Sequence, residues 1–233
     1  MRAEKQNSEV RQDQIITAAM ALIAEQGLKA LSVAALAQKV GIVPSALYRH
    51  FQGKEEIIKG ALKKIKDLLM TNVQSVRQAS PNALERLRLL TNRHIAMIKE
   101  FQAIPRIVFS DEINASYPLG RSTVYAILRA YLAEVASIVR QGEREGQIKP
   151  ELDPETVAVF YLGLVQPPII LWYLSDGSFD AVRHTEKAWA IFKKAIGAQP
   201  NRSLEDAACR RKAVKGALEV NTRKEKNHES HHR

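Results

Sequence analysis

Apolar residues recur at steps of three and four along almost the whole chain, and this spacing restricts the fold more than any other feature. In residues 11–26 the spacing produces one stripe, made of Ile15, Ile16, Ala19, Leu22 and Ile23. We find no sustained alternation of apolar and polar residues, and no Asn-Gly or Asp-Gly turn between β-rich runs. The sequence therefore predicts an all-α protein.

Glycines, a serine and a proline mark where the predicted helices begin and end. Gly27, Gly41 and Gly53 follow the first three helical patterns, as expected of residues that end helices. Ser32 is a good N-cap for the second helix, and Pro44 suits the first turn of the third. The predicted helices span 11–26, 33–40, 44–52, 54–72, 84–99, 101–110, 121–145, 154–174 and 179–196, with a loop at 111–120.

Charge is concentrated at the two ends of the chain. The net charge is +10, and the first 70 residues carry 11 Lys and Arg against 7 Asp and Glu. The segment 201–233 carries 9 against 5, whereas the segment 71–200 is nearly balanced. Basic ends favour a polyanionic partner only modestly, because many soluble proteins are mildly basic.

Three features bear on the location of the protein. Cys209 is the single cysteine, which fits a reducing cytosol, and the N-terminus lacks the apolar core of a secretory signal. The apolar run 157–174 is interrupted by Gln166, Pro167 and Pro168. We therefore expect a buried, kinked helix there rather than a membrane span, and a cytoplasmic protein.

The stretch GIVPSALYRHFQGKEE, residues 41–56, combines an apolar anchor with exposed hydrogen-bonding side chains. Leu47 and Phe51 lie four apart and share one helix face, which can pack on the two preceding helices. Arg fits the O6 and N7 edge of guanine, whereas Tyr, His and Lys side chains suit phosphate oxygens. An outer polar face on three small helices is also common without any function. The helix-turn-helix spacing nevertheless favours DNA binding.

Residues 11–62 resemble the N-terminal domain of the TetR family of transcriptional regulators. The run LSVAALAQKVGIVPSALYRHFQGKEEII, from Leu31 to Ile58, carries the resemblance, and its LYRHFxGKEE core is the most specific part. The later two thirds of the chain match only in their helical layout. The resemblance implies a homodimeric repressor whose C-terminal domain responds to a ligand.

Transferred by position, the resemblance implies a role for each residue of the motif. Tyr48 and His50 would contact phosphates, Arg49 would reach base edges, and Lys54 would hold the DNA backbone. Ser32 would cap its helix and touch phosphate, and the pair Pro44 and Ser45 would face the groove. Many members have Ser or Thr where this chain has Val43, which cannot cap a helix but could touch a thymine methyl group.

The resemblance also implies a division of the chain. We expect an N-terminal arm at 1–10, a helix-turn-helix DNA-binding domain at 11–60, and a helical bundle for ligand binding and dimerisation at 61–198. A basic, disordered tail would follow at 199–233. The expected function is a cytoplasmic repressor, without cofactor or enzymatic activity, that binds a palindromic operator on double-stranded DNA. A small apolar or amphipathic effector would release it.

The effector site and the dimer interface are predicted from the later helices. Those at 84–99, 101–110 and 121–145 would enclose a cavity, and the two apolar helices at 154–174 and 179–196 would pair with a second copy. The predicted lining residues, for which plain core packing is the alternative, are Phe101, Arg106, Phe109, Tyr125 and Trp172.

Other chemistries receive little support from the residues. His94, Asp111 and Glu112 lack the spacing of metal ligands, and we find no phosphate-binding glycine loop or nucleophile elbow. Two alternatives remain open at this point. One is an all-α small-molecule-binding protein or enzyme with an incidental helix-turn-helix. The other is a non-specific DNA binder that uses its basic tail.

Overall fold

A computed structural model describes residues 2–113 and 119–198, with side chains described from residue 8. The described residues are almost entirely helical and contain no strand beyond an isolated bridge between Ile148 and Gly197, which confirms the all-α prediction. The predicted tail at 199–233 and the middle of the predicted loop lie outside the described residues. The elements are α1 (Arg2–Gln26), η1 (Leu28–Ala30), α2 (Val33–Val40), α3 (Pro44–Tyr48), α4 (Lys54–Ala79), α5 (Ala83–Glu100), α6 (Ala103–Val108), α7 (Gly120–Arg144), α8 (Pro154–Leu162), α9 (Gln166–Leu174) and α10 (Ala181–Ile196).

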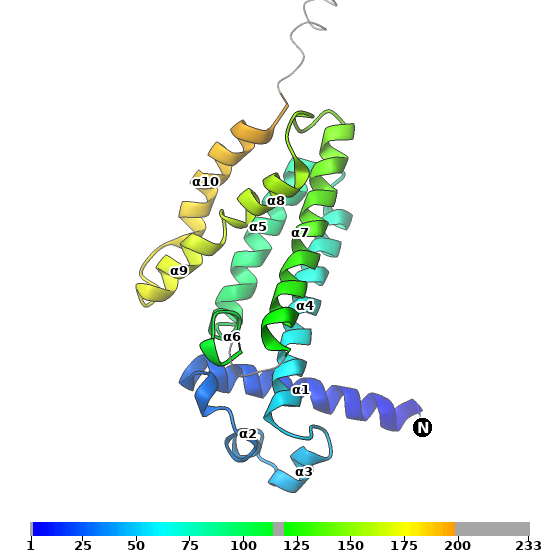
Figure 1. Ribbon diagram of the computed structural model, residues 1–233, viewed down its shortest axis with the longest axis vertical. Helices are drawn as coiled ribbons and strands as arrows, with labels where there is room; N and C mark the ends of the chain where they lie inside the picture. The colour runs from blue at the N-terminus through cyan, green and yellow to red at the C-terminus, as the bar shows by residue number, and fades with distance from the viewer. Residues whose placement is uncertain (1, 114–118, 199–233) are drawn as a thin grey trace, which may run out of the picture. The chain divides into compact units, whose positions relative to one another are not determined.

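Within residues 2–197 the helices form two groups that share α4 (Figure 1). Helices α1, α2 and α3 gather at one end, and α1 packs on α2, α4 and α6. Helices α4, α5 and α7 run away from this end, with α8 against α7, and α10 against α5 and α9. Helix α4 therefore connects the small N-terminal group directly to the larger bundle.

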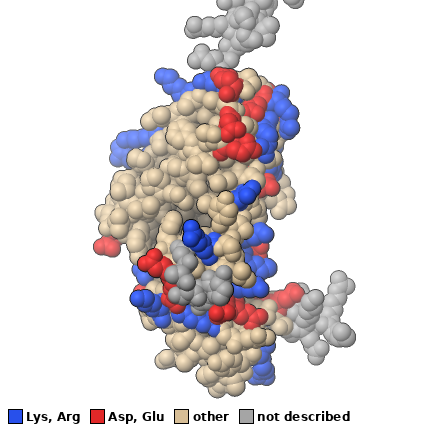
Figure 2. Space-filling model, in the orientation of Figure 1, with Lys and Arg blue, Asp and Glu red and all other residues tan. Residues whose placement is uncertain are grey.

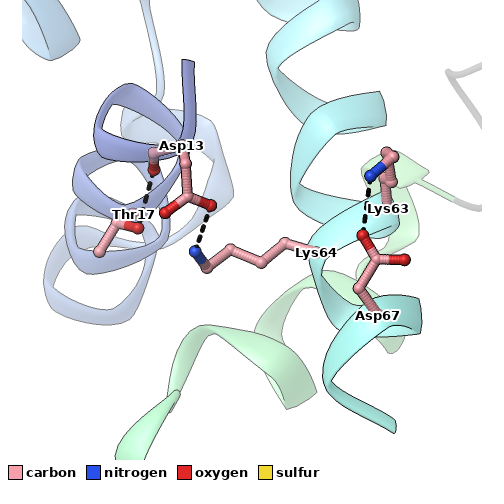
Figure 3. A network of polar contacts seen from close by, with 5 residues as sticks. All are labelled: Asp13, Thr17, Lys63, Lys64 and Asp67. Atoms are coloured by element: carbon pink, nitrogen blue, oxygen red, sulfur yellow. Dashed lines mark hydrogen bonds and ion pairs between the residues drawn. The ribbon is translucent and has the colours of Figure 1, made fainter. Parts of the chain in front are cut away.

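The N-terminal group is held by a shared apolar core and by ion pairs between its helices. Ile15 and Ile23 of α1, Leu47 of α3 and Ile57 of α4 are fully buried. Asp13 of α1 also accepts a hydrogen bond from Lys64 Nζ of α4 at 2.6 Å (Figure 3). The small group is thus fixed to the first half of α4.

Three predicted helix ends were wrong. Helix α1 begins at Arg2 rather than residue 11, because its first turns are rich in good helix formers but carry no apolar stripe. Helix α3 ends at Tyr48, well before Gly53. Helix α4 continues to Ala79, with Val73 and Val76 extending its buried face.

The single helix predicted at 154–174 is broken in two. Helix α8 ends before Gly163, and α9 begins at Gln166 with Pro167 in its first turn. Proline fits a first turn, where the N–H has no partner, but breaks the hydrogen bonding of a continuous helix. The prolines therefore divide the segment instead of merely kinking it.

Two segments, Gly120–Arg144 and Pro154–Leu174, are long and apolar enough to cross a membrane by length and composition. Core helices of soluble proteins pass the same test. Here Tyr131 and Val135 of the first segment are buried, as are Tyr161 and Val165 of the second. The inward sides of both segments thus belong to the core of the bundle.

Candidate functional site

The turn between α2 and α3 is built by a cap and a glycine. Ser32 Oγ accepts a hydrogen bond from the backbone N–H of Ala35 at 3.1 Å, which confirms the predicted cap. Gly41 ends α2 with a φ of 74°, a left-handed conformation that favours glycine. The predicted anchors Leu47 and Phe51 are buried. The sequence therefore sets both the direction of α3 and the face that it buries.

Most of the predicted DNA-contact residues are exposed on and around α3. Val43 and Tyr48 have exposed fractions of 62% and 55%, and Pro44, Ser45 and Arg49 are exposed as well. Arg49 follows the last residue of the short α3. Val43 occupies the N-cap position without a side-chain hydrogen bond, as the sequence predicted. The outer side of α3 thus carries a continuous group of exposed side chains.

His50 is placed differently from its neighbours. Its side chain is half-buried, and its carbonyl accepts a hydrogen bond from Gln12 Nε2 of α1 at 3.3 Å. Its Nδ1 is buried without a hydrogen-bond partner among the described residues. The His50 side chain is therefore partly enclosed rather than extending freely outward, and its carbonyl links the end of α3 to α1.

Lys54, the first residue of α4, forms an ion pair with a residue that is far from it in the sequence. Its Nζ lies 2.8 Å from Oε1 of Glu112, which follows α6, and the two side chains are only 27% and 23% exposed. The second carboxylate oxygen, Oε2, is buried without a partner among the described residues. Lys54 is thus paired within the chain at the point where a DNA backbone contact was predicted.

A cavity of about 440 Å³ lies inside the larger bundle, against the helix that joins it to α1–α3. Its wall is predominantly apolar, with a few polar side chains among the lining residues. The residues come from α4 to α9, and they are Leu62, Ile65, Leu69, His94, Met97, Ile98, Ile104, Pro105, Arg106, Val108, Phe109, Val124, Ile127, Leu128, Tyr131, Leu162, Gln166, Ile169, Ile170, Tyr173 and Leu174.

The structure brings two of the five predicted lining residues to this cavity. Arg106 and Phe109 line it. Phe101, Tyr125 and Trp172 lie outside the lining: Phe101 packs against the core, Tyr125 is exposed, and Lys99 lies over the Trp172 ring.

Arg106 connects the cavity wall to the N-terminal helices. Its guanidinium lies over the ring of Tyr173, 5.5 Å from the ring centre, and Nη1 is 4.0 Å from where a Cβ on Gly27 would stand. Its Nε is buried without a hydrogen-bond partner, and no carboxylate pairs with it among the described residues. A cation with unsatisfied hydrogen-bonding capacity therefore stands beside an apolar cavity.

Buried polar groups lie at another part of the cavity, where His94 and Tyr131 line the wall and Thr91 and Tyr161 lie outside the lining. His94 Nδ1 lies 3.0 Å from the Tyr131 hydroxyl, and Thr91 Oγ1 lies 3.1 Å from the hydroxyl of Tyr161. Burial lowers the pKa of His94 to about 4, and burial raises the pKa of both tyrosines. The imidazole and both phenols are therefore neutral near pH 7.

Sequence reasoning missed most of this wall. From the sequence, His94 was considered only as a metal ligand, a role that its spacing disfavoured. Within the described residues no group of three metal-ligating side chains occurs. The available signal was the position of His94 on the apolar stripe of α5, four residues after Leu90 and one before Ile95. The α4 residues of the wall, such as Ile65, carry no signal that separates a cavity from a core.

Three helices that share a buried apolar core, with a capped second helix, a glycine turn and a third helix whose outer side is exposed, define a helix-turn-helix DNA-binding protein. A family model described as bacterial regulatory proteins of the tetR family matches residues 15–61. A second model, described as a tetracyclin repressor-like C-terminal domain, matches residues 80–196. The chain belongs to the TetR family and is a DNA-binding transcriptional regulator.

Curated relatives and solved structures agree with this assignment. The chain is 26% identical to the nucleoid occlusion factor SlmA of Vibrio vulnificus over 188 residues, which are 80% of this chain and 95% of the relative. It is 26% identical to a fatty acid metabolism regulator protein of Bacillus subtilis over 169 residues, or 72% and 87%. It shares the fold of the regulator FadR from Bacillus subtilis in complex with stearoyl-CoA, with a TM-score of 0.66, 24% identity, and coverage of 77% and 96%.

Proposed function

We propose that this regulator is a cytoplasmic, homodimeric repressor that binds a palindromic operator and releases it when an amphipathic effector occupies the cavity. Residues 11–60 would bind DNA, and residues 61–198 would hold the effector and form the dimer. The observation that carries the proposal is Arg106, a cation that lines an apolar cavity and also lies against the end of α1. The two curated relatives of this chain are named as a nucleoid occlusion factor and as a metabolism regulator rather than as enzymes, which disfavours the enzymatic alternative.

On DNA, the exposed side of α3 would enter the major groove. Arg49 would read a base edge, because its fork matches guanine O6 and N7. Val43, Pro44 and Ser45 would lie at the groove-facing start of α3, and Tyr48 would contact phosphate. His50 and Ser32 would position the helix-turn-helix on the DNA. Lys54 would bind the DNA backbone after its ion pair with Glu112 breaks.

The effector we propose is an acyl compound with an apolar chain and a polar or anionic head. The apolar wall suits the chain, and Arg106 suits a carboxylate or phosphate group. A relative is named for fatty acid metabolism, and a structural neighbour was solved with stearoyl-CoA. Both names support this class of effector.

Coupling between cavity and DNA requires that the effector bind one arrangement of the helices better than another. Helix α6 supplies Arg106 to the cavity and packs on α1, and Glu112 beyond α6 pairs with Lys54. Movement of this segment on effector binding would therefore displace α1 and the start of α4 together. The DNA-competent spacing of the two α3 helices would be lost.

Dimerisation is supported by a broad apolar surface. Figure 2 shows mostly uncharged atoms over α8 and α9. The exposed apolar side chains of α8, α9 and α10 are Val159, Phe160, Ile170, Leu171, Tyr173, Leu174, Val182 and Ile191. A second copy related by a two-fold axis would cover this surface and would match half-sites about 34–36 Å apart.

The proposal is tested by finding the operator through genome-wide footprinting and then measuring its affinity with dodecanoyl-CoA added. We expect Arg49→Ala to weaken operator binding by about 1–3 kcal/mol and to relax one base position. Arg93→Ala, an exposed arginine on α5, is the matched control and should leave affinity unchanged. Unchanged operator affinity in Arg49→Ala would refute the reading role, and unchanged affinity with acyl-CoA bound would refute effector control.

A further inference from the structure

We infer that His94 selects effectors that carry a hydrogen-bond acceptor oxygen on the part of the chain inside the cavity. The preferred ligands would be hydroxy- or oxo-substituted acyl compounds rather than plain saturated ones. This inference rests on the proposed function, because it names the chemistry of the effector of the same cavity.

The orientation of the His94 ring is fixed by Tyr131. The two rings meet edge to face, with centroids 5.2 Å apart and an interplanar angle of 87°. Nδ1 lies 3.0 Å from the Tyr131 hydroxyl. Both residues are buried in the protein and both line the cavity. Because Tyr131 holds one edge of the imidazole, the edge that carries Nε2 is available to a ligand.

The proton positions follow from the chemistry of the pair. A phenol O–H is a stronger acid than a neutral imidazole N–H, and an imidazole nitrogen is a stronger base than a phenol oxygen. The Tyr161 hydroxyl is a second neighbour of the Tyr131 hydroxyl. It is a weaker base than imidazole, and it already accepts from Thr91 Oγ1 at 3.1 Å and donates to the Leu87 carbonyl at 3.3 Å. Tyr131 therefore donates to Nδ1, and the neutral ring carries its proton on Nε2. His94 thus offers an N–H donor.

This donor has no hydrogen-bond partner among the described residues. Most of the other residues that line the cavity are apolar, such as Ile98 and Leu128. A histidine that only packs in a core normally satisfies both ring nitrogens. When an apolar chain fills the cavity it excludes water and leaves this N–H unpaired, whereas a ligand oxygen accepts its hydrogen bond. The site therefore distinguishes chains with an acceptor oxygen from chains without one.

Arg106 and His94 together define a ligand with two polar points. Arg106 would hold the head group, and the Nε2–H of His94 would hold an oxygen farther along the chain. Sites built to hydrogen-bond a polar group discriminate strongly against analogues that lack it, since the protein group is then left unpaired. We expect a preference of about 10- to 100-fold for the oxygenated chain.

The test compares dodecanoyl-CoA with a series of monohydroxy- and mono-oxododecanoyl-CoA esters in which the oxygen is moved along the chain. Binding to the full-length protein at pH 7.5 is measured by calorimetry. In wild type, at least one oxygenated ester should bind about 10- to 100-fold more tightly than dodecanoyl-CoA. His94→Phe should abolish that difference, so that the oxygenated esters bind no more tightly than dodecanoyl-CoA. His94→Gln, which retains an N–H donor, should keep part of it.

The outcomes separate the inference from the proposed function. If dodecanoyl-CoA binds and no oxygenated ester is preferred, the inference fails and the acyl effector stands. The inference also fails if the preference survives in folded His94→Phe or, should that variant not fold, is fully retained by His94→Leu. If none of the esters binds, the inference and the proposed effector class fail together.

Discussion

At the residue scale, local geometry at a few positions decides whether α3 is presented correctly. Gly41 has no heavy atom within 4 Å of an added Cβ, so substitution there meets no steric clash. The demand on this position comes only from its φ of 74°. A substitution at Gly41 therefore measures backbone strain without a change in packing.

We expect Gly41→Ala to lower the free energy of unfolding by about 1–2 kcal/mol, since alanine is strained in the left-handed region. Chemical denaturation monitored by circular dichroism measures the loss. Gly53→Ala is the matched control, because its extended φ of 168° suits any residue and it is equally free of close neighbours. Equal losses in the two variants would contradict the assignment to backbone strain.

The buried His94 predicts a pH-dependent stability. Its pKa of about 4 lies below the usual value of 6.5 in the unfolded chain, so acid protonates the unfolded state first. Its contribution to stability should fall by about 2 kcal/mol between pH 7 and pH 5 and continue falling to about pH 4. The measurement compares urea unfolding of wild type and His94→Phe across this range. A difference between them that is independent of pH would contradict the buried neutral state.

At the scale of elements, the spacing of apolar residues predicted which face each helix buries better than it predicted where a helix begins or which distant residues it contacts. The fully buried Leu47 and Ile57 followed directly from apolar steps of three and four. The polar start of α1 carried no such signal, so the helix was placed nine residues late. The pairing of Lys54 with Glu112 joins positions 58 residues apart, and nothing in the local sequence of either residue indicates it.

That ion pair predicts an effect on DNA binding. Glu112→Gln removes the partner of Lys54 and should raise operator affinity about 2- to 10-fold, with a steeper salt dependence by about one phosphate contact. Asp67→Asn removes the same charge from the exposed pair with Lys63 on α4 (Figure 3) and is the matched control. Electrophoretic mobility shifts across a salt series provide the measurement. If both variants gain equally, net charge rather than release of Lys54 is responsible.

At the scale of the whole molecule, the apolar surface of α8, α9 and α10 carries the argument for a dimer. The sequence predicted helices that bury more than one side, and in the described chain their inner sides are buried whereas their outer sides are exposed. A large exposed apolar surface of this kind marks an interaction site. The second buried side would come from a second copy.

We expect Ile191→Glu to shift the protein toward monomer, because a charge would be placed within the proposed interface. Ile191 is 72% exposed in the single chain, so the monomer should remain folded. Val10→Glu, an equally charged change at an exposed apolar residue of α1, should leave the dimer intact. Analytical ultracentrifugation distinguishes the two. A wild-type monomer at micromolar concentration would contradict the proposal outright.

The break between α8 and α9 has a consequence for how such a dimer would respond to effector concentration. Helix α9 supplies Ile169 and Tyr173 to the cavity, whereas Leu171 is exposed on the surface that the partner would cover. One short helix, detached by its prolines from α8, would then be shared between a ligand site and a subunit boundary. An effector in the cavity of one subunit would shift α9 at the interface with the second subunit. Occupancy should therefore rise more steeply with effector concentration than for independent sites. The operator would accordingly be released over a narrow range of effector concentration.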